Sequence, residues 1–368
     1  MVGSRTTRLL ASCLGALMAV VVLAGCGGGG GSSSGSGSLP TIRLAVSITT
    51  PDVAQSYYTS LPQELGYWKK AGINVQLEFF DGDAAGLQAV AAGKADASIS
   101  GTNTIVTALD NGKSLVGYMV DARKNLYFPA APAGSGITTM SEFKGRTVGL
   151  QSLTSSSYGI LKGILKLSGV DPNSVHYVSV GTGAEVAAAI KQHRIDTYQA
   201  STNLYSALQP YGVNLQPVPS TVSDQMGFST ALETPTANLT SHQKEYVALA
   251  KGIAEARAFA AANPRAAVLL HWKAYPTVKP TSIPENEAIT DAIAQLQSRL
   301  SVAAVDSDGS YGHGNQQQIT STLKVYQAGG IMTKPLTAGQ VFTDKYVDQI
   351  NDFDLKAIQQ QAAAYKVS

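Results

Sequence analysis

The sequence predicts an α/β protein built from two similar lobes, and three observations support this fold class. Segments that alternate apolar and polar residues, as strands do, are followed by helical segments over residues 42–100. The same succession begins again over residues 147–200. In addition, Ala89–Ala97 aligns with Ala189–Thr197, so that Asp96 matches Asp196 in a weak internal repeat. Strands that alternate with helices are typical of parallel sheets, so we expect a central sheet flanked by helices in each lobe.

The elements of both lobes follow from these patterns. Strands are expected at 42–48, 73–80 and 95–100 in the first lobe, and at 147–150, 175–179 and 195–200 in the second. Between them we expect helices through Leu61 and Trp68, and at 84–92, 156–168 and 184–192, with Gly72, Gly93 and Gly169 placed to end helices. The tail predicts further helices at 243–262, 286–300, 316–328 and 343–365.

The first residues predict an export signal with lipid attachment. Arg5 and Arg8 precede an apolar run at 9–24, which is too short for a confident membrane span and typical of a secretory signal. The run ends in Leu23-Ala24-Gly25-Cys26, which resembles the lipobox of bacterial lipoproteins. We therefore expect residues 1–25 to be removed and Cys26 to be lipidated. An ordinary signal peptide that happens to contain a cysteine is the alternative.

Residues 27–38 are only Gly and Ser, which is typical of a flexible coil. With the lipidated cysteine, residues 26–39 would tether the folded part to the outer face of the cytoplasmic membrane, in the periplasm or at the cell surface. The tether would span about 20 Å. We expect the tethered protein to be a monomer.

Composition excludes several classes of protein. The 27 Lys and Arg nearly balance the 25 Asp and Glu and form no basic run, so no nucleic-acid partner is expected. The two cysteines, Cys13 and Cys26, belong to the signal and the lipidation site, which leaves no thiol for a disulfide or a nucleophile. No zinc, hydrolase, phosphate-loop or dinucleotide motif occurs, so we expect no metal, no cofactor and no catalytic residue.

Four segments, in order, resemble one family. They are Gln63–Val75, Gly93–Ala97, Met140–Gly149 and Gly181–Asp196. Each resembles the corresponding part of the nitrate, sulfonate, taurine and thiamine-precursor binding proteins of ABC transporters, well over Ile42–Thr230 and loosely in the tail. The resemblance implies a type II periplasmic-binding-protein fold, with a ligand in the cleft between two lobes and closure that is recognised by the permease subunits.

The resemblance also implies a domain organisation. We expect residues 40–130 to form the first part of lobe 1, 131–230 to form lobe 2, and 231–368 to return to lobe 1 as a mostly helical tail. Crossing segments near Tyr127–Gly136 and Asp224–Thr234 would carry the hinge. One position departs from the family, because His193 stands where its turn normally carries Gly. A non-glycine residue in a left-handed turn costs roughly 1 kcal/mol.

Candidate ligand-binding residues follow from the rule that ligands bind at the carboxyl ends of strands in open α/β sheets. The loop at 151–156 is the most informative, because it has several hydroxyls and no acid and leads into a helix whose N–H groups suit an anion. Helix capping is the alternative use of those hydroxyls. The full set is Thr49, Thr50, Tyr57, Tyr58, Gly82, Asp83, Gly101, Thr102, Asn103, Ser152, Thr154, Ser155, Ser156, Tyr158 and Ser201.

The expected function is that of an extracytoplasmic solute-binding lipoprotein that delivers a small molecule to an ABC importer. The 151–156 loop suits nitrate, taurine or an alkanesulfonate, and Asp81 and Asp83 could hold an ammonium group. The tyrosines would instead suit a heteroaromatic vitamin precursor, such as a thiamine pyrimidine or a flavin. An enzyme of the thiamine-precursor synthase type shares the architecture, and a structural lipoprotein is a third class. The export signal, the missing nucleophile–base pair and the internal repeat argue against these two.

Overall fold

Ten strands form two five-stranded sheets in the computed structural model, which describes residues 38–206, 208–303 and 305–366. The expected signal peptide, Cys26 and nearly all of the tether lie outside the described residues. Residues Leu39–Ser368 form one unit, within which both sheets lie.

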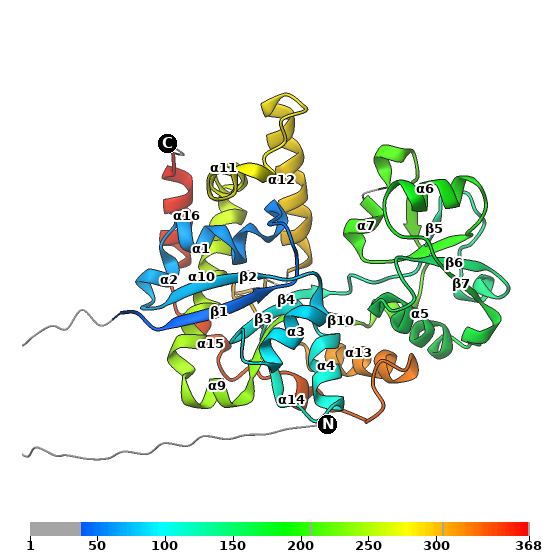
Figure 1. Cartoon of the computed structure of the whole chain (residues 1–368), viewed down its shortest axis with the longest axis horizontal. Coiled ribbons are helices and arrows are strands. Elements are labelled where there is room, and N and C mark those ends of the chain that lie inside the picture. Colours follow the sequence, from blue (N-terminus) through cyan, green and yellow to red (C-terminus); the bar gives the residue numbers. More distant parts are fainter. Residues whose placement is uncertain (1–37, 207, 304, 367–368) are drawn as a thin grey trace, which may run out of the picture. The chain divides into compact units, whose positions relative to one another are not determined.

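The first sheet has the strand order β2-β1-β3-β10-β4 (Figure 1). Strand β1 pairs in parallel with β2 and β3, whereas β10 runs antiparallel to β3 and β4. The sequence predicted the three parallel strands but not β4 and β10, since both are buried along most of their length and show no clean two-residue alternation. The strands are β1 (Thr41–Val46), β2 (Asn74–Phe79), β3 (Ala97–Gly101), β4 (Leu115–Lys124) and β10 (Gly227–Pro235).

The second sheet repeats this plan with the order β7-β6-β8-β5-β9. Strand β6 is parallel to β7 and β8, and β5 is antiparallel to β8 and β9. Each sheet thus places its first parallel strand second in order, with an antiparallel strand in fourth place. This arrangement confirms the predicted fold class of two sheets flanked by helices. The strands are β5 (Ala130–Pro132), β6 (Thr147–Leu150), β7 (His176–Ser179), β8 (Thr197–Gln199) and β9 (Leu215–Pro217).

Two short segments connect the sheets, residues 125–129 between β4 and β5 and residues 218–226 between β9 and β10. The Asn125 amide holds them together, because its Nδ2 donates to the backbone oxygen and the hydroxyl of Ser223 at 3.3 and 3.0 Å. The hinge segments expected at Tyr127–Gly136 and Asp224–Thr234 extend beyond these connections, because they include β5 and most of β10. The small residues Ala130 and Ala131 are buried and paired rather than free to bend.

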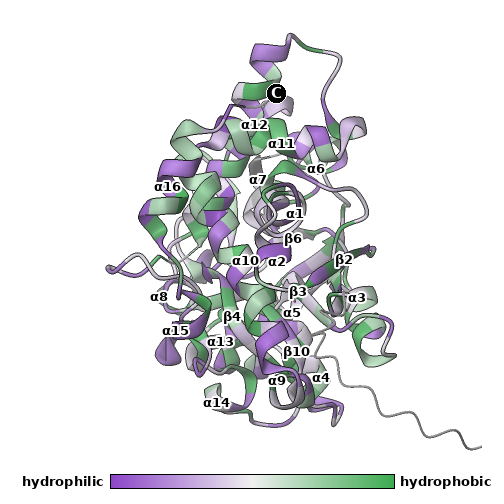
Figure 2. Cartoon of the chain, turned by 90° about the vertical axis from the view of Figure 1, so that its left-hand side faces the viewer, coloured by the Kyte–Doolittle hydropathy of each residue, from purple (hydrophilic) through white to green (hydrophobic). Residues whose placement is uncertain are grey.

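Helices surround both sheets, and helices such as α12 and α16 carry both hydrophilic and hydrophobic residues (Figure 2). On one face of the first sheet, Leu44 packs with Leu249 of α10 and Val268 of α11; the other face packs with α4 and α13. The helices are α1 (Ser60–Glu64), α2 (Tyr67–Lys70), α3 (Asp83–Ala91), α4 (Asn103–Asp110), α5 (Ser156–Leu167), α6 (Ala184–Lys191), α7 (Thr202–Ser206), α8 (Thr221–Asp224), α9 (Thr236–Ser241), α10 (Gln243–Ala262), α11 (Pro264–Ala274), α12 (Glu285–Val302), α13 (Gln316–Ala328), α14 (Ala338–Val341), α15 (Val347–Ile350) and α16 (Leu355–Ala364), with 3-10 turns η1 (Val53–Tyr58), η2 (Met140–Phe143), η3 (Pro172–Ser174), η4 (Gln209–Tyr211) and η5 (Pro276–Val278).

The last predicted helix, 343–365, is wrong. The chain forms α15 and α16 there, separated by residues 351–354. At the break, the Asn351 side chain is bonded to both backbone groups of Tyr311, each at 2.8 Å, and Asp354 starts α16 by accepting from the Ala357 N–H at 3.0 Å. These tertiary and capping bonds override the helical periodicity. No helix in the described part of the chain is both long and apolar enough to cross a membrane.

The predicted repeat has the same hydrogen bonds in both lobes. Asp96 accepts from the Arg43 N–H at 2.8 Å, and Asp196 accepts from the Thr147 N–H at 2.8 Å. Each aspartate also pairs with an arginine, Arg43 in the first lobe and Arg146 in the second. The aspartates thus join the start of one strand to the turn before the next strand in each sheet.

His193 adopts the left-handed conformation that its position predicts, with φ of 56°, where Gly93 has 66°. We therefore expect His193→Gly to raise the free energy of unfolding by up to about 1 kcal/mol, because the cost of a left-handed Cβ disappears. Gln192→Gly, one residue earlier at φ −89°, should lower the free energy of unfolding, since glycine there only gives the unfolded chain more conformational freedom. Urea denaturation of the three proteins checks this, and a less stable His193→Gly would contradict it.

Candidate functional site

The predicted residues that follow β1 form an exposed pair and a buried pair. Thr49 and Thr50 are exposed, and Thr50 lines a groove of about 570 Å³ with Trp272 and Asp291. Tyr57 and Tyr58 are buried, with ring centroids 4.9 Å apart in an edge-to-face pair. These two tyrosines therefore lie behind the loop, in the core, in this conformation.

Asp83 and Gly101 bring the loops after β2 and β3 together. The Gly101 N–H donates to Asp83 Oδ2 at 3.2 Å, and a Cβ at Gly101 would lie 2.5 Å from Asn103 Oδ1 and 2.7 Å from Asp83 Oδ2. Only glycine allows both polar groups to approach so closely. Thr102 is fully buried and donates to the Phe228 carbonyl oxygen at 2.5 Å. Gly82, at φ 83°, turns the chain into α3.

In the second lobe, the hydroxyls of the 151–156 loop bond to groups of the loop itself and of the first turn of α5. Ser152 and Thr154 lie 2.6 Å apart through their side-chain oxygens, and Ser155 donates to the Ser152 carbonyl at 2.7 Å. Ser155 is the N-cap of α5 but caps no N–H with its side chain. Capping therefore does not use this hydroxyl, and the first turn of α5, which begins at the half-buried Ser156, has N–H groups that the N-cap side chain leaves uncapped.

The remaining predicted residues, Tyr158 and Ser201, lie in different surroundings. Tyr158 is half-buried, with its ring 4.9 Å from that of Tyr177 and the Lys162 ammonium 4.5 Å from its centre. Ser201 forms an isolated bridge with Tyr127, which belongs to the first crossing segment. This bridge joins the loop after β8 to the connection between the sheets.

A buried charged cluster that sequence reasoning missed lies at the end of β4. Asp121, 1% exposed, accepts hydrogen bonds from Arg257 of α10 and Arg299 of α12. It also accepts from the Tyr57 hydroxyl at 2.7 Å and from Thr230 at 2.8 Å. One carboxylate thus faces two guanidinium groups. An acid inside an apolar strand and an arginine inside an Ala-rich helix were the signals that could have found it.

The two arginines differ in exposure. The Arg257 side chain is 1% exposed and stacks on the Tyr57 ring at 4.4 Å. The Arg299 side chain is 16% exposed, and its Nε donates to the Tyr57 hydroxyl at 3.2 Å. Although burial raises the pKa of Asp121, the two guanidiniums and the hydroxyl donors outweigh it and hold that pKa below its usual value. Arg299 is therefore the cation of this cluster that a solute could reach.

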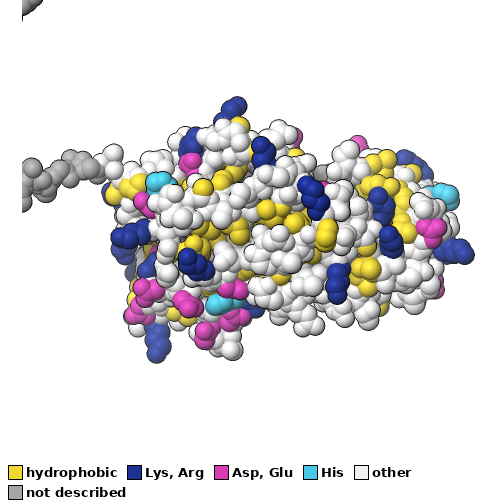
Figure 3. Space-filling view, turned by 90° about the horizontal axis from the view of Figure 1, so that it is seen from below, with side chains coloured by type: hydrophobic (Ala, Val, Ile, Leu, Met, Phe, Trp, Pro, Cys, Tyr) yellow, Lys and Arg dark blue, Asp and Glu magenta, His cyan; other side chains and the backbone are white. Residues whose placement is uncertain are grey.

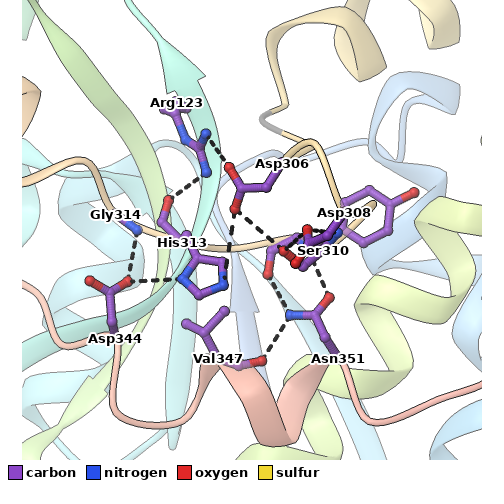
Figure 4. Close-up of polar contacts among 10 residues, drawn as sticks. Arg123, Asp306, Asp308, Ser310, His313, Gly314, Asp344, Val347 and Asn351 are labelled. Atoms are coloured by element: carbon purple, nitrogen blue, oxygen red, sulfur yellow. Dashed lines mark hydrogen bonds and ion pairs between the residues drawn. The ribbon is translucent and has the colours of Figure 1, made fainter.

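A loop after α12 is fastened beside this cluster (Figure 4). Arg123, two residues beyond Asp121 on β4, binds Asp306 at 2.7 Å and the His313 carbonyl at 3.0 Å. The Gly314 N–H donates to Asp344 at 2.8 Å. The loop carries Tyr311, whose ring lies 5.9 Å from the Arg257 guanidinium. These contacts fix the loop to β4, and with it the end of α12 that bears Arg299.

Glu233 is a second buried acid of the first sheet. Its carboxylate accepts from Ser98 and Ser100 at 2.6 Å each and from Thr104 at 2.9 Å. No cation pairs with it in the described part of the chain, and burial raises its pKa from 4.5 to about 7 despite the three hydroxyl donors. Between these two values the folded protein holds a proton that the unfolded chain has released.

This proton makes stability depend on pH. The free energy of unfolding should fall by about 3 kcal/mol as the pH rises from 4.5 to above 7, from Glu233 alone. Glu233→Gln removes this pH-dependent contribution. The free energy of unfolding of the variant should therefore rise relative to that of the wild type as the pH rises. Urea denaturation at pH 5 and pH 8 measures the difference. The exposed Glu287→Gln is the control, and an equal difference at both pH values would contradict the assignment.

The strand register brings several of these groups to one edge of the first sheet. Thr230 of β10 is paired with Gly101 of β3, and Arg299 Nη2 lies 3.3 Å from the Thr230 hydroxyl. Since Gly101 also binds Asp83, the Arg299 and Asp83 side chains both contact residues of this β3–β10 pair. Within the described residues, no group of three or more His, Cys, Asp or Glu side chains is placed to hold a metal ion.

The fold is that of the periplasmic binding proteins, with two sheets of the same plan. The chain belongs to the NMT1/THI5 like family, whose model matches residues 53–267. Among curated protein sequences, none matches this chain significantly.

Solved structures are similar in fold at low sequence identity. The alkanesulfonate-binding protein SsuA from Xanthomonas axonopodis pv. citri, bound to MOPS, is 15% identical with a TM-score of 0.58, over 82% of this chain and 98% of that one. The periplasmic nitrate-binding protein NrtA from Synechocystis PCC 6803 is 14% identical with a TM-score of 0.54, over 90% and 99%. A mutant of DszB, in complex with biphenyl-2-sulfinic acid, is 13% identical with a TM-score of 0.53, over 85% and 99%.

Proposed function

We propose that this chain is the exported solute-binding protein of an ABC importer and that it captures a small anion, such as taurine, an alkanesulfonate or nitrate. The observation that carries the proposal is the pair of donor-rich sites on two similar sheets. The first turn of α5 offers N–H groups and hydroxyls on the second sheet, and Arg299 offers a partly exposed cation on the first. The family and the likeness to SsuA and NrtA support the same class of ligand.

We further propose that the ligand binds between the two sheets and draws them together. Contact with donors on both sheets would give the ligand a higher affinity for the closed state, which is what shifts such an equilibrium. Residues 125–129 and 218–226 would bend, with Asn125 and Ser223 keeping them side by side. Small-angle X-ray scattering should show a smaller radius of gyration with saturating ligand, and an unchanged radius would count against closure.

Export and anchoring complete the proposal. The apolar run at 9–24 and Cys26 would place the protein, by its lipid, on the outer face of the cytoplasmic membrane, and permease subunits would be its partners. On the face shown in Figure 3, basic side chains are scattered rather than gathered into one patch, which favours a small ligand over a polyanion. Mass spectrometry of the membrane-extracted protein tests the anchor, since a Cys26→Ser variant should lose the lipid mass.

An enzyme is the alternative that the comparisons raise, because DszB has the same fold. This chain has no cysteine after Cys26 to act as a nucleophile. The histidine that lies deepest, His271, touches Ser60 at 2.8 Å, but burial lowers its pKa to about 4 and both side chains are within the first core. Because both side chains are almost fully buried, a substrate cannot reach them in this conformation, so binding without turnover is the function we favour.

A thermal-shift screen tests the proposed function. The exported protein, stripped of endogenous ligand by unfolding and refolding, is screened against nitrate, taurine, alkanesulfonates, pyrimidines and flavins. We expect an anion of the first three kinds to raise the melting temperature, as any ligand of the native state does. Stabilisation by a pyrimidine or flavin alone would select the heteroaromatic alternative, and conversion of the bound compound would select the enzyme.

A further inference from the structure

A buried amide without a protein partner lies at the end of a strand in the second sheet. Gln199 is the last residue of β8 and is 1% exposed. Neither its side-chain oxygen nor its side-chain nitrogen has a hydrogen-bond partner among the residues that the structure describes. Since most buried polar groups in folded proteins are hydrogen-bonded, an amide with both atoms unpaired is rare and lowers stability. Its position at the carboxyl end of a strand, where ligands bind to α/β sheets, points to a role in binding.

The strand register shows on which face of the sheet the Gln199 side chain lies. Gln199 is paired with Leu150 across the parallel strands β8 and β6. Its neighbour Tyr198 belongs to the core cluster that contains residues of α6, and successive residues of a strand point to opposite faces. Val148, on the same face as Leu150, belongs instead to the cluster that contains residues of α5. The Gln199 side chain therefore lies on the α5 face.

The first turn of α5 begins at this same edge of the sheet. The chain leaves β6 at Leu150 and enters α5 at Ser156, and α5 contacts β8. The side chain of the N-cap residue, Ser155, caps none of the N–H groups of that turn. An anion there is favoured by these N–H groups and by the helix dipole. The buried amide is an independent feature of the same face and the same edge, and its NH2 group is a donor that an anion can accept.

We propose that the Gln199 side chain binds the solute, with Nε2 donating to an anionic oxygen held at the first turn of α5. This inference rests on the proposed function and assigns to the second sheet a ligand contact on a strand, outside the 151–156 loop. A neutral donor suits the position, because an unpaired amide costs the ligand-free protein less free energy than an unpaired buried charge. Gln199 thus lowers stability and adds to affinity, a combination typical of binding residues.

Gln199→Met tests the proposal by two measurements that should change in opposite directions. Methionine has nearly the same length but no amide, so the ligand-free variant should melt about 2 °C or more above the wild type. Binding should weaken about tenfold or more, since a hydrogen bond to a charged group is lost. Calorimetric titration measures the affinity for whichever of taurine, ethanesulfonate and nitrate binds the wild type most tightly. A residue that served only the core would change stability without changing affinity.

Thr197→Val is the matched control. Thr197 lies on the same face of β8, two residues before Gln199, is fully buried, and has a hydroxyl without a partner in the described structure. Valine should also raise the melting temperature but leave the affinity unchanged. A Gln199→Met protein that binds as tightly as the wild type, or that melts no higher, would overturn this inference and leave the proposed function standing. Failure of the wild type to bind any of the three compounds would overturn both.

Discussion

Replacing Asp121 with alanine is expected to lower the free energy of unfolding by about 3–5 kcal/mol, the cost of leaving a buried charge unpaired. Asp121 is the carboxylate that faces both Arg257 and Arg299, and its own side chain is 1% exposed. Without it, the Arg257 guanidinium would remain almost fully buried against the Tyr57 ring with no anion beside it. Equilibrium denaturation in urea measures the loss.

A matched control separates this effect from the loss of any ion pair. Asp306→Ala removes the partner of Arg123, but both side chains are more than 20% exposed, so water can replace the carboxylate. This variant should lose on the order of 1 kcal/mol or less. Adding Arg257→Met to Asp121→Ala should recover much of the loss, because the unpaired charge is gone. Equal losses in Asp121→Ala and Asp306→Ala would contradict the account of the cluster.

Gly163→Ala is expected to destabilise the protein by about 1–3 kcal/mol, the usual cost of overpacking. Helix α5 of the second lobe packs against α13 of the tail, and a Cβ at Gly163 would overlap the Val325 carbonyl oxygen. At the end of the other helix, a Cβ at Gly329 would overlap the Gly159 carbonyl oxygen. Two backbones therefore touch, and neither offers a flexible side chain that could move away. Thermal denaturation measures the effect.

Gly339→Ala is the control for this substitution. Gly339 lies in α14 with no other atom near its missing Cβ, so alanine should leave stability unchanged or raise it by up to about 1 kcal/mol. Both variants replace glycine with alanine, but Gly163→Ala is expected to lower stability, whereas Gly339→Ala is expected to leave it unchanged or raise it. A Gly163→Ala protein as stable as Gly339→Ala would show that the α5–α13 contact is looser than described.

The regular parts of this fold could be predicted from the sequence because local apolar patterns and turn residues mark them. The helices at 243–262 and 316–328 match α10 and α13 to the residue, and the strand at 147–150 matches β6. Strands β4 and β10 were missed, since burial on both faces removes the alternation that marks a strand. The break before α16 was missed because the bonds between Asn351 and Tyr311 join residues 40 positions apart.

In the candidate site too, residues brought in by distant parts of the chain could not be predicted from the sequence. The rule on strand ends selected Asp83 and Gly101, which do meet. It could not select Arg299, because that residue comes from α12, 178 positions beyond Asp121, and reaches the same edge only through Asp121 and Thr230. Tyr57 and Tyr58, which were selected because they follow the first loop, lie in the core together with residues of α10 and α12. The positions of these side chains depend on contacts between segments that lie far apart in the sequence.

The central claim is that the chain binds a small anionic solute, and calorimetric titration of the exported protein tests it most directly. Taurine, ethanesulfonate and nitrate are each injected into protein freed of endogenous ligand. The account predicts a saturable heat with one molecule bound per chain for at least one of them. The absence of any heat above dilution for all three, from protein shown to be folded, would contradict it.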